Sequence, residues 1–243
     1  MAVSRDDWAQ FVASRRTTRD FLETPVPSQL IDELLQDAMT APSWSNTRPY
    51  LVGIATGAKR DQISKDLLAR WEAAAKALRG GTWGKIKLFF TRFGLPKSDY
   101  RVFRPYPKEL VPRQQRVGSE LYGLLGIKRD DHVARQAQWA RNYEFFGAPV
   151  ELFIFTHKGL GEYSVSDAGL FMQNLMLGAH ARGLGTCAQG AVALWADPIR
   201  KQFQIPKGYK LLCGIALGYP SDHKVNSFQA ERLPIQDIKL KDV

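Results

Sequence analysis

Three short apolar runs most constrain the fold of this chain of 243 residues. They extend from Tyr50 to Ala55, from Val150 to Phe155 and from Leu211 to Leu217, and each has the length of a buried strand. Helical patterns occupy the long intervals between them, so the strands are few and far apart in the sequence. We therefore expect an α+β fold in which helices surround a small sheet.

Cap signals indicate where several of these helices begin and end. Ser4, Ser28 and Ser166 each precede a helical pattern and are the expected N-terminal caps. Gly183 follows the last periodic residue of the helix that starts at Ser166 and is expected to close it. Asp197-Pro198 is expected to start another short helix, because proline is favoured in the first turn.

Two Arg-rich segments lie near the two ends of the chain, at residues 14–19 (SRRTTR) and 231–234 (ERLP). The guanidinium group is a planar fork of donors that binds phosphate oxygens two at a time. We interpret the two segments as halves of one anion site. The alternative is that arginines at the end of a helix only complement its dipole.

A polar, aromatic loop at residues 41–50 (APSWSNTRPY) leads into the first predicted strand. It is dense in side-chain amide, hydroxyl and aromatic groups. Such a loop suits a flat polar ring, because aromatic faces stack on the ring while short polar side chains reach its edge.

A Gly-x-Gly sequence at residues 183–185 could be taken for a dinucleotide-binding motif. That motif must follow a strand and open a helix, whereas this one follows a helix. We interpret it as a turn that exposes backbone N–H groups.

Six segments in order resemble the FMN-dependent nitroreductase family, and the resemblance covers nearly the whole chain. They are SRRTTRDF, APSWSNTRPY, FFGAPVELF, SDAGLFMQNLMLGAHARGLGTCAQG, CGIALGYP and AERLPIQDI. The resemblance implies a nitroreductase-like α+β fold with a small, mainly antiparallel sheet, a single domain over residues 1–243, and an intertwined homodimer with two FMN sites across its interface.

The resemblance also implies which residues contact FMN. One subunit contributes the phosphate and pyrimidine contacts and backbone donors facing the flavin N5 and O4, and the partner subunit approaches the same flavin with the loop at residues 41–50. The expected cofactor-binding residues are Arg15, Arg16, Thr17, Arg19, Gln189, Gly190 and Arg232 from one subunit, and Ser43, Trp44, Ser45 and Asn46 from the other. The chain departs from the family at Ala188, where many relatives have proline, and at Ala230, where some have lysine.

The activity implied by the resemblance is NAD(P)H oxidation through FMN. Hydride passes from NAD(P)H to flavin N5 and then to a flat, electron-poor acceptor such as a nitroaromatic compound or a quinone. No catalytic side chain is expected, because the flavin carries the chemistry. Relatives with other flavin reactions, namely ene reduction, dehalogenation and ring oxidation, leave alternatives open, as does the choice between NADH and NADPH.

The formal charge of +10 is concentrated in one segment. Residues 76–116 contain eleven Lys/Arg and two acidic residues, a net charge of +9, and we interpret this stretch as a basic, aromatic insertion. Trp83, Ile86, Phe90 and Phe93 recur within it at helical spacing. The helix either packs over the mouth of the site or on the partner subunit, or it contacts an anionic membrane surface through residues 83–93.

The remaining composition indicates a cytoplasmic protein without metal or nucleic acid. No apolar run approaches the ~20 residues that span a bilayer, and the N-terminus does not read as a signal peptide. The two cysteines and four histidines show no metal-ligand spacing. A basic nucleic-acid-binding protein is the alternative from another class; it predicts a steep salt dependence, and no helix-turn-helix, zinc or RRM pattern supports it.

Overall fold

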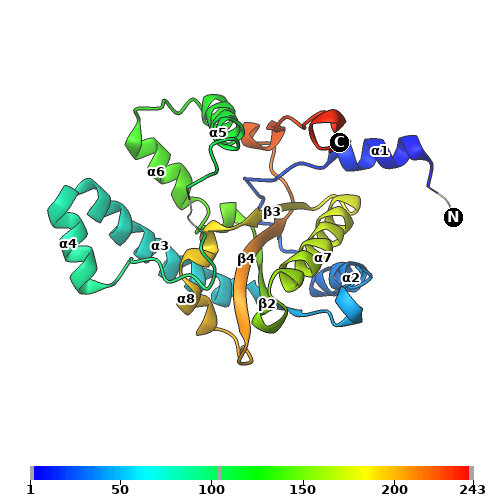
Figure 1. Ribbon diagram of the computed structural model, residues 1–243, viewed down its shortest axis with the longest axis horizontal. Coiled ribbons are helices and arrows are strands. Elements are labelled where there is room, and N and C mark those ends of the chain that lie inside the picture. Colours follow the sequence, from blue (N-terminus) through cyan, green and yellow to red (C-terminus); the bar gives the residue numbers. More distant parts are fainter. Residues whose placement is uncertain (1–2, 103–104, 241–243) are drawn as a thin grey trace.

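A computed structural model describes residues 3–102 and 105–240 (Figure 1). Its strands form one antiparallel sheet with the order β1-β2-β4-β3, which confirms the predicted small sheet. The three apolar runs form three of these strands, and each is slightly longer than predicted. The strand bounds are β1 (Tyr50–Thr56), β2 (Val150–His157), β3 (Gly185–Gln189) and β4 (Tyr209–Gly218).

Helices cover both faces of the sheet and its ends (Figure 1). The α-helices are α1 (Arg5–Ser14), α2 (Ser28–Ala38), α3 (Gly57–Arg79), α4 (Gly81–Thr91), α5 (Val111–Leu125), α6 (His132–Ala140), α7 (Glu162–Ala181) and α8 (Ala196–Arg200). Short 3-10 helices are η1 (Trp44–Asn46), η2 (Phe145–Gly147), η3 (Lys158–Leu160), η4 (Ala191–Leu194), η5 (Lys224–Ser227) and η6 (Ile235–Asp237).

Strand β3 corrects the interpretation of the Gly-x-Gly sequence as a turn. Only Gly183, with φ of 71°, forms the turn that follows α7. From Gly185 onward the chain pairs with β4, where Gly185 lies opposite Gly218 and Gln189 opposite Gly214. The segment is short and polar, so its strand character comes from this pairing and not from local propensity.

The predicted helix starts are correct at one position and wrong at three. Ser4 caps α1 and accepts a hydrogen bond of 3.1 Å from the backbone N–H of Asp7. Ser28 is the first residue of α2, and Pro27 occupies the cap. Helix α7 begins at Glu162, four residues before Ser166, after Gly161 turns the chain with φ of 53°. Helix α8 begins at Ala196, one residue before the predicted Asp197.

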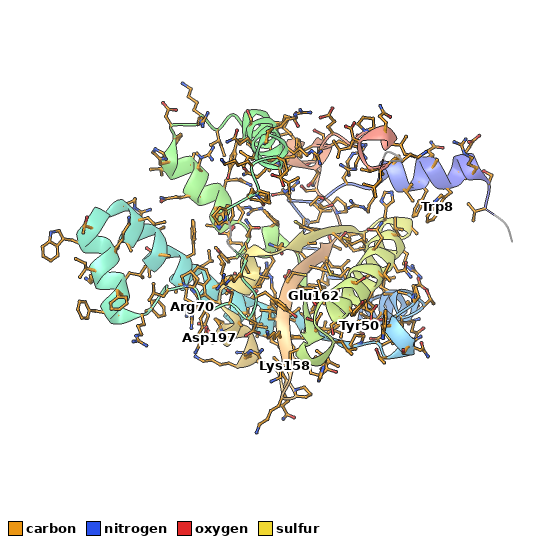
Figure 2. All side chains as sticks on the ribbon, in the orientation of Figure 1. Trp8, Tyr50, Arg70, Lys158, Glu162 and Asp197 are labelled. Atoms are coloured by element: carbon orange, nitrogen blue, oxygen red, sulfur yellow. The ribbon has the colours of Figure 1, made fainter. Side chains whose placement is uncertain are left out.

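The sheet separates two hydrophobic cores. Alternate residues of β2 point to opposite faces, so Leu152 packs with Leu34 and Leu175 under α2 and α7, while Phe153 packs on the other face with Trp195. An ion pair joins the helices on this second face, where Nη2 of Arg70 on α3 lies 2.5 Å from Oδ2 of Asp197 on α8 (Figure 2).

Helices α3 and α4 form a hairpin that projects from the body of the protein (Figure 1). The aromatic side chains of α4 are exposed in this single chain, where Trp83 is 81% and Phe90 80% accessible. The sequence FRPYP at residues 103–107 predicts an extended, proline-stiffened loop, and the first two of these residues lie outside the described structure. None of the described helices combines the length and apolar character needed to cross a bilayer.

Candidate functional site

The segment after α1 runs along the edge of the sheet beside β3. The backbone N–H of Thr18 donates to the carbonyl oxygen of Thr186 at 3.0 Å, and that of Leu22 donates to Tyr219 at 2.9 Å. Gly185 permits this close approach, because a Cβ at that position would overlap the side chain of Thr18. The first Arg-rich segment is therefore held in an extended form at the edge of the sheet.

The C-terminal part of the chain is hydrogen-bonded to the same segment through Asn226. Its Oδ1 accepts from the backbone N–H of Arg19 at 2.8 Å, and its Nδ2 donates to the carbonyl oxygens of Asp20 at 2.8 Å and Ser221 at 3.0 Å. Sequence reasoning missed Asn226, because a single Asn in a loop gives no motif. Its contacts explain why the two ends of the chain meet.

A cavity of about 280 Å³ lies where these segments meet the end of α7. Two cationic side chains, hydroxyl groups and the glycine turn surround it, and its described lining contains no acidic residue. The lining residues are Ser14, Arg15, Arg16, Thr18, His180, Gly183, Leu184, Gly185, Thr186, Pro220 and Asn226.

The cations at this cavity are crowded. Burial lowers the pKa of Arg15, and the neighbouring charges of Arg232 and Arg16 lower it further. The two Arg-rich segments, more than two hundred residues apart in sequence, thus converge as predicted. The guanidinium group of Arg15 donates to the carbonyl oxygen of Arg16 at 2.9 Å, and that of Arg16 donates to Ala13 at 2.8 Å, so carbonyl oxygens and not carboxylates are their described partners.

His180 also borders the cavity and was not identified from the sequence. Its Nε2 lies 2.7 Å from the hydroxyl of Ser14, and its ring contacts Phe11 with 5.1 Å between ring centres. Burial lowers its pKa, with further contributions from Arg15 and Arg16. The imidazole is therefore held in its neutral form, in which it adds a polar but uncharged group to the cavity.

The predicted backbone donors lie at the other end of β3. Gln189 is buried, and its Nε2 donates to the carbonyl oxygen of Asn142 at 2.7 Å. Gly190 follows as an exposed residue at the turn into η4. This turn follows directly from the strand that also borders the cationic cavity, so one element positions both features.

The loop with Ser43, Trp44, Ser45 and Asn46 lies elsewhere, against the first half of α7. The backbone N–H of Trp44 donates to the buried carboxylate of Asp167 at 3.0 Å, and the indole contacts Tyr163 with 4.2 Å between ring centres. Ser45 and Asn46 have positive φ values of 48° and 57°. These described contacts do not bring the loop to the cationic cavity of the same chain.

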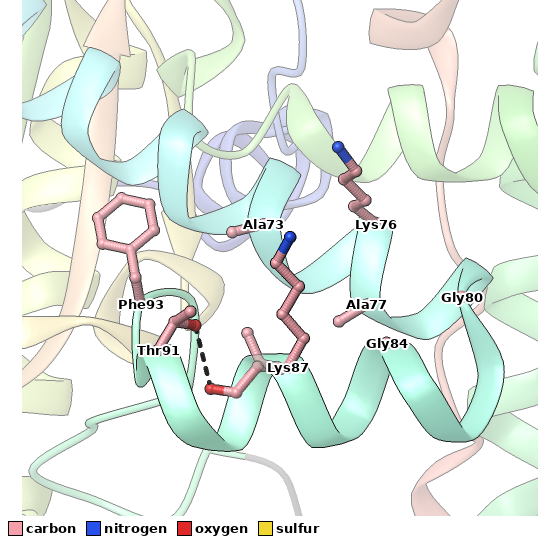
Figure 3. Close-up of a pocket in the computed structure, with 9 residues that line it drawn as sticks. Ala73, Lys76, Ala77, Gly80, Gly84, Lys87, Thr91 and Phe93 are labelled. Carbon is pink, nitrogen blue, oxygen red and sulfur yellow. Dashed lines mark hydrogen bonds between the residues drawn. The ribbon is translucent and has the colours of Figure 1, made fainter.

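A second cavity, of about 380 Å³, lies between α3 and α4 (Figure 3). Small and apolar residues such as Ala73, Ala77 and Gly84 form most of its lining, together with the long side chains of Lys76 and Lys87. It contains none of the residues predicted to bind a cofactor. We therefore assign the site to the edge of β3.

An antiparallel sheet between helices carries guanidinium groups at its edge, an arrangement that suits an anionic group such as a phosphate. Sequence comparison then identifies the family. The Nitroreductase family profile matches residues 12–219, and the chain belongs to this family.

Two curated relatives and one solved structure illustrate the similarity. The chain is 35% identical to 4-nitrobenzoate reductase from Pseudomonas putida, over 96% of this chain and 94% of the relative. It is 30% identical to chloronitrobenzene nitroreductase from Comamonas testosteroni, over 95% and 92%. The crystal structure of the FMN-dependent nitroreductase NfnB from Mycobacterium smegmatis in complex with NADPH superposes with a TM-score of 0.81 at 26% identity, covering 97% of this chain and 98% of that one.

Proposed function

We propose that the protein is an FMN-dependent NAD(P)H oxidoreductase that reduces nitroaromatic compounds. The observation that carries this proposal is a cavity lined by Arg15 and Arg16 and by no acidic residue among the described ones, with Arg232 close enough to lower the pKa of Arg15. The family membership supports it, as do relatives named for 4-nitrobenzoate and chloronitrobenzene reduction and a similar structure named as FMN-dependent and bound to NADPH.

The residues at the edge of β3 fit the phosphate end of FMN. Arg15, Arg16 and Arg232 supply the cations, and Thr17 and Thr18 supply hydroxyl groups beside them. Arg19 is close enough to β3 to lower the pKa of Cys187, and its guanidinium carbon lies 5.9 Å from the ring centre of Phe228. A dianionic phosphate relieves the mutual repulsion of the arginines, which is a further reason for the fit.

Bound FMN supplies the hydride acceptor and donor chemistry. The chain contributes binding and orientation: the arginines hold the phosphate, and the Gln189–Gly190 turn presents backbone N–H groups toward the ring. Holding the hydride donor and the acceptor in line can lower the activation free energy by ~7–11 kcal/mol. No acid–base side chain is assigned.

We propose further that the active form is a homodimer in which the partner subunit supplies Ser43, Trp44, Ser45 and Asn46. Trp44 is 53% exposed in the single chain, although its backbone is fixed by Asp167. On α7, Gly169 and Leu170 are also exposed, and a Cβ on Gly169 would meet nothing within 4 Å. This face of α7 has room for a second backbone.

A hybrid experiment tests the shared site. Arg15→Gln and Asn46→Ala subunits are each expected to bind FMN about tenfold or more weakly than the wild type as homodimers. Mixing them creates a dimer with one intact site and one doubly altered site, so FMN binding returns at one site per hybrid dimer. Hybrids that bind no FMN, or a protein that sediments as a monomer, would refute the shared site.

The activity is tested by anaerobic spectroscopy. Protein loaded with FMN is expected to lose its yellow absorbance when NADPH or NADH is added, and 4-nitrobenzoate is expected to restore it. Bleaching that a quinone reverses but no nitroaromatic compound does would move the assignment to quinone reduction. Colourless protein that takes up no FMN would end the proposal.

The exposed aromatic residues of α4 support one further proposal, peripheral contact with an anionic membrane through residues 83–93. Trp83 and Phe90 lie on this helix with Lys85 and Lys87, and interfacial helices combine such residues. Co-sedimentation with liposomes that does not depend on anionic lipid would remove it. We propose a cytoplasmic location, where NAD(P)H is supplied, and cell fractionation tests it.

A further inference from the structure

Glu151 of β2 is fully buried, and neither of its carboxyl oxygens has a hydrogen-bond partner among the described residues. On the strand register it lies beside Ala216 of β4, with Cys187 of β3 beyond. A buried polar group without a hydrogen-bond partner destabilises the folded state. A carboxyl group in this position therefore requires a structural explanation.

Small residues of β4 make room for this carboxyl group. Gly214 precedes Ala216 by two residues on β4, so the two positions share a face of the sheet. Gly214 pairs with Phe153 of β2 on one side and with Gln189 of β3 on the other. A Cβ on Gly214 would overlap Oε1 of Glu151 and would lie 2.7 Å from Cγ2 of Val192 in η4. The carboxyl group thus lies over Gly214, between the sheet and the 3-10 helix that follows the Gln189–Gly190 turn.

Gln189 has an unpaired atom beside the same glycine. Its Nε2 donates to Asn142, but its Oε1 is buried and has no partner among the described residues. Directly opposite residues of neighbouring strands share a face, so the side chain of Gln189 and the carboxyl group of Glu151 flank Gly214 on one face. Two neighbouring acceptors are satisfied together if the carboxyl group carries a proton.

The electrostatic surroundings favour the protonated acid. Burial raises the pKa of Glu151 well above its usual range, and the attraction of Arg60 on α3 opposes this only in part. Among the described residues, the thiols of Cys187 on β3 and Cys213 on β4 are the other titratable groups that interact with it. Burial raises the pKa of each thiol to about 12, so both are neutral near pH ~7. The nearby part of η4 is apolar.

We propose that Glu151 positions the Gln189–Gly190 turn by donating its carboxyl proton to Oε1 of Gln189. The inference rests on the proposed function, in which this turn faces FMN. With Oε1 held by Glu151 and Nε2 by Asn142, the side chain of Gln189 is fixed at both ends, and so is the start of the turn. A neutral acid also keeps negative charge away from a cofactor that gains electrons.

The first test uses the flavin-free protein and compares the wild type with Glu151→Gln. An unfolded Glu loses its proton near pH ~4.3, whereas the folded protein retains it. The wild type is therefore expected to lose stability relative to Glu151→Gln as the pH rises above that value, about tenfold in the unfolding equilibrium constant per pH unit. Parallel pH profiles for the two proteins would overturn the proposal.

Infrared spectroscopy of the wild type is an independent test, and Glu151→Gln is the one variant that it needs for comparison. The wild type near pH ~7 is expected to show the carbonyl band of a buried protonated carboxyl group, and Glu151→Gln is expected to lack it. A wild type without this band would show that Glu151 is ionised and would overturn the proposal.

FMN binding then tests positioning. Glu151→Gln retains a donor for Oε1 of Gln189 and is expected to bind FMN as the wild type does, whereas Glu151→Ala is expected to bind about tenfold more weakly.

Equal FMN affinity of Glu151→Gln and Glu151→Ala would reduce Glu151 to a packing residue and overturn the proposal. A wild type that takes up no FMN would refute the proposed function instead. In that case the pH and infrared results on flavin-free protein still decide whether the acid–amide pair exists.

Discussion

Replacement of Arg15 by Gln separates cofactor binding from fold stability. The guanidinium group of Arg15 is half-buried beside two other cations, Arg232 and Arg16. The substitution removes one hydrogen bond to a carbonyl oxygen, worth about 1 kcal/mol, but it also relieves desolvation and repulsion. We therefore expect the free energy of unfolding of flavin-free protein to change by less than about 1 kcal/mol.

FMN affinity is expected to respond much more strongly. A hydrogen bond to a charged group contributes about 1.5–3 kcal/mol, which corresponds to a dissociation constant roughly ten- to a hundredfold higher. Arg15→Lys keeps the charge but loses the planar fork of donors, so its FMN affinity is expected to lie between those of the wild type and Arg15→Gln. Quenching of FMN fluorescence on titration measures the affinity, and thermal unfolding of flavin-free protein measures the stability.

Arg5→Gln is the matched control, because Arg5 is an exposed arginine of α1 whose ionic partner is the equally exposed Asp6. It is expected to leave both quantities unchanged. If Arg15→Gln binds FMN as the Arg5 variant does, Arg15 does not hold the phosphate. If it loses as much fold stability as FMN affinity, the arginine is structural.

Three further predictions concern other groups at the site. Because burial raises the pKa of Cys187 and Cys213 to about 12, neither thiol is expected to react with a disulfide reagent near pH ~8 until the protein unfolds, and a rapid reaction of native protein would contradict this. Gly185→Ala is expected to displace Thr18 and cost about 1–3 kcal/mol with loss of FMN, as denaturant unfolding and titration can show. The pKa of His180 is lower in the folded protein than in the unfolded chain, so the unfolded chain takes up this proton at a higher pH. Flavin-free protein is therefore expected to lose stability as the pH falls from ~7 to ~5. His180→Asn is expected to remove this part of the pH dependence of the free energy of unfolding.

The sequence predicted the architecture best where local patterns and tertiary structure agree. The apolar runs at Tyr50, Val150 and Leu211 became β1, β2 and β4, because continuous apolar strands need burial on both faces. Residues 185–189 have no such pattern, and their strand forms only through pairing with β4. Cap residues were misplaced where Pro27 and Gly161 turn the chain before the expected serine.

The site was predictable in part. The two Arg-rich segments lie close enough for Arg232 to lower the pKa of Arg15, as their shared suitability for one anion led us to expect, and their binding of one phosphate stays a prediction. Asn226 and His180 escaped notice, since each is a single polar residue whose partners come from distant segments. Glu151 was hidden within an apolar run, and only the register shows that its carboxyl group lies over Gly214. The FMN contacts of the residues at positions 43–46 stay a prediction.

The meeting of Arg15 and Arg232 also determines when cofactor can be captured during biosynthesis. Arg232 leaves the ribosome more than two hundred residues after Arg15. A nascent chain that already contains every strand still lacks the last cation of the pocket. If Arg232 closes the phosphate site, we therefore expect tight flavin binding to begin only after the segment with Arg232 has left the ribosome and packed beside Arg15.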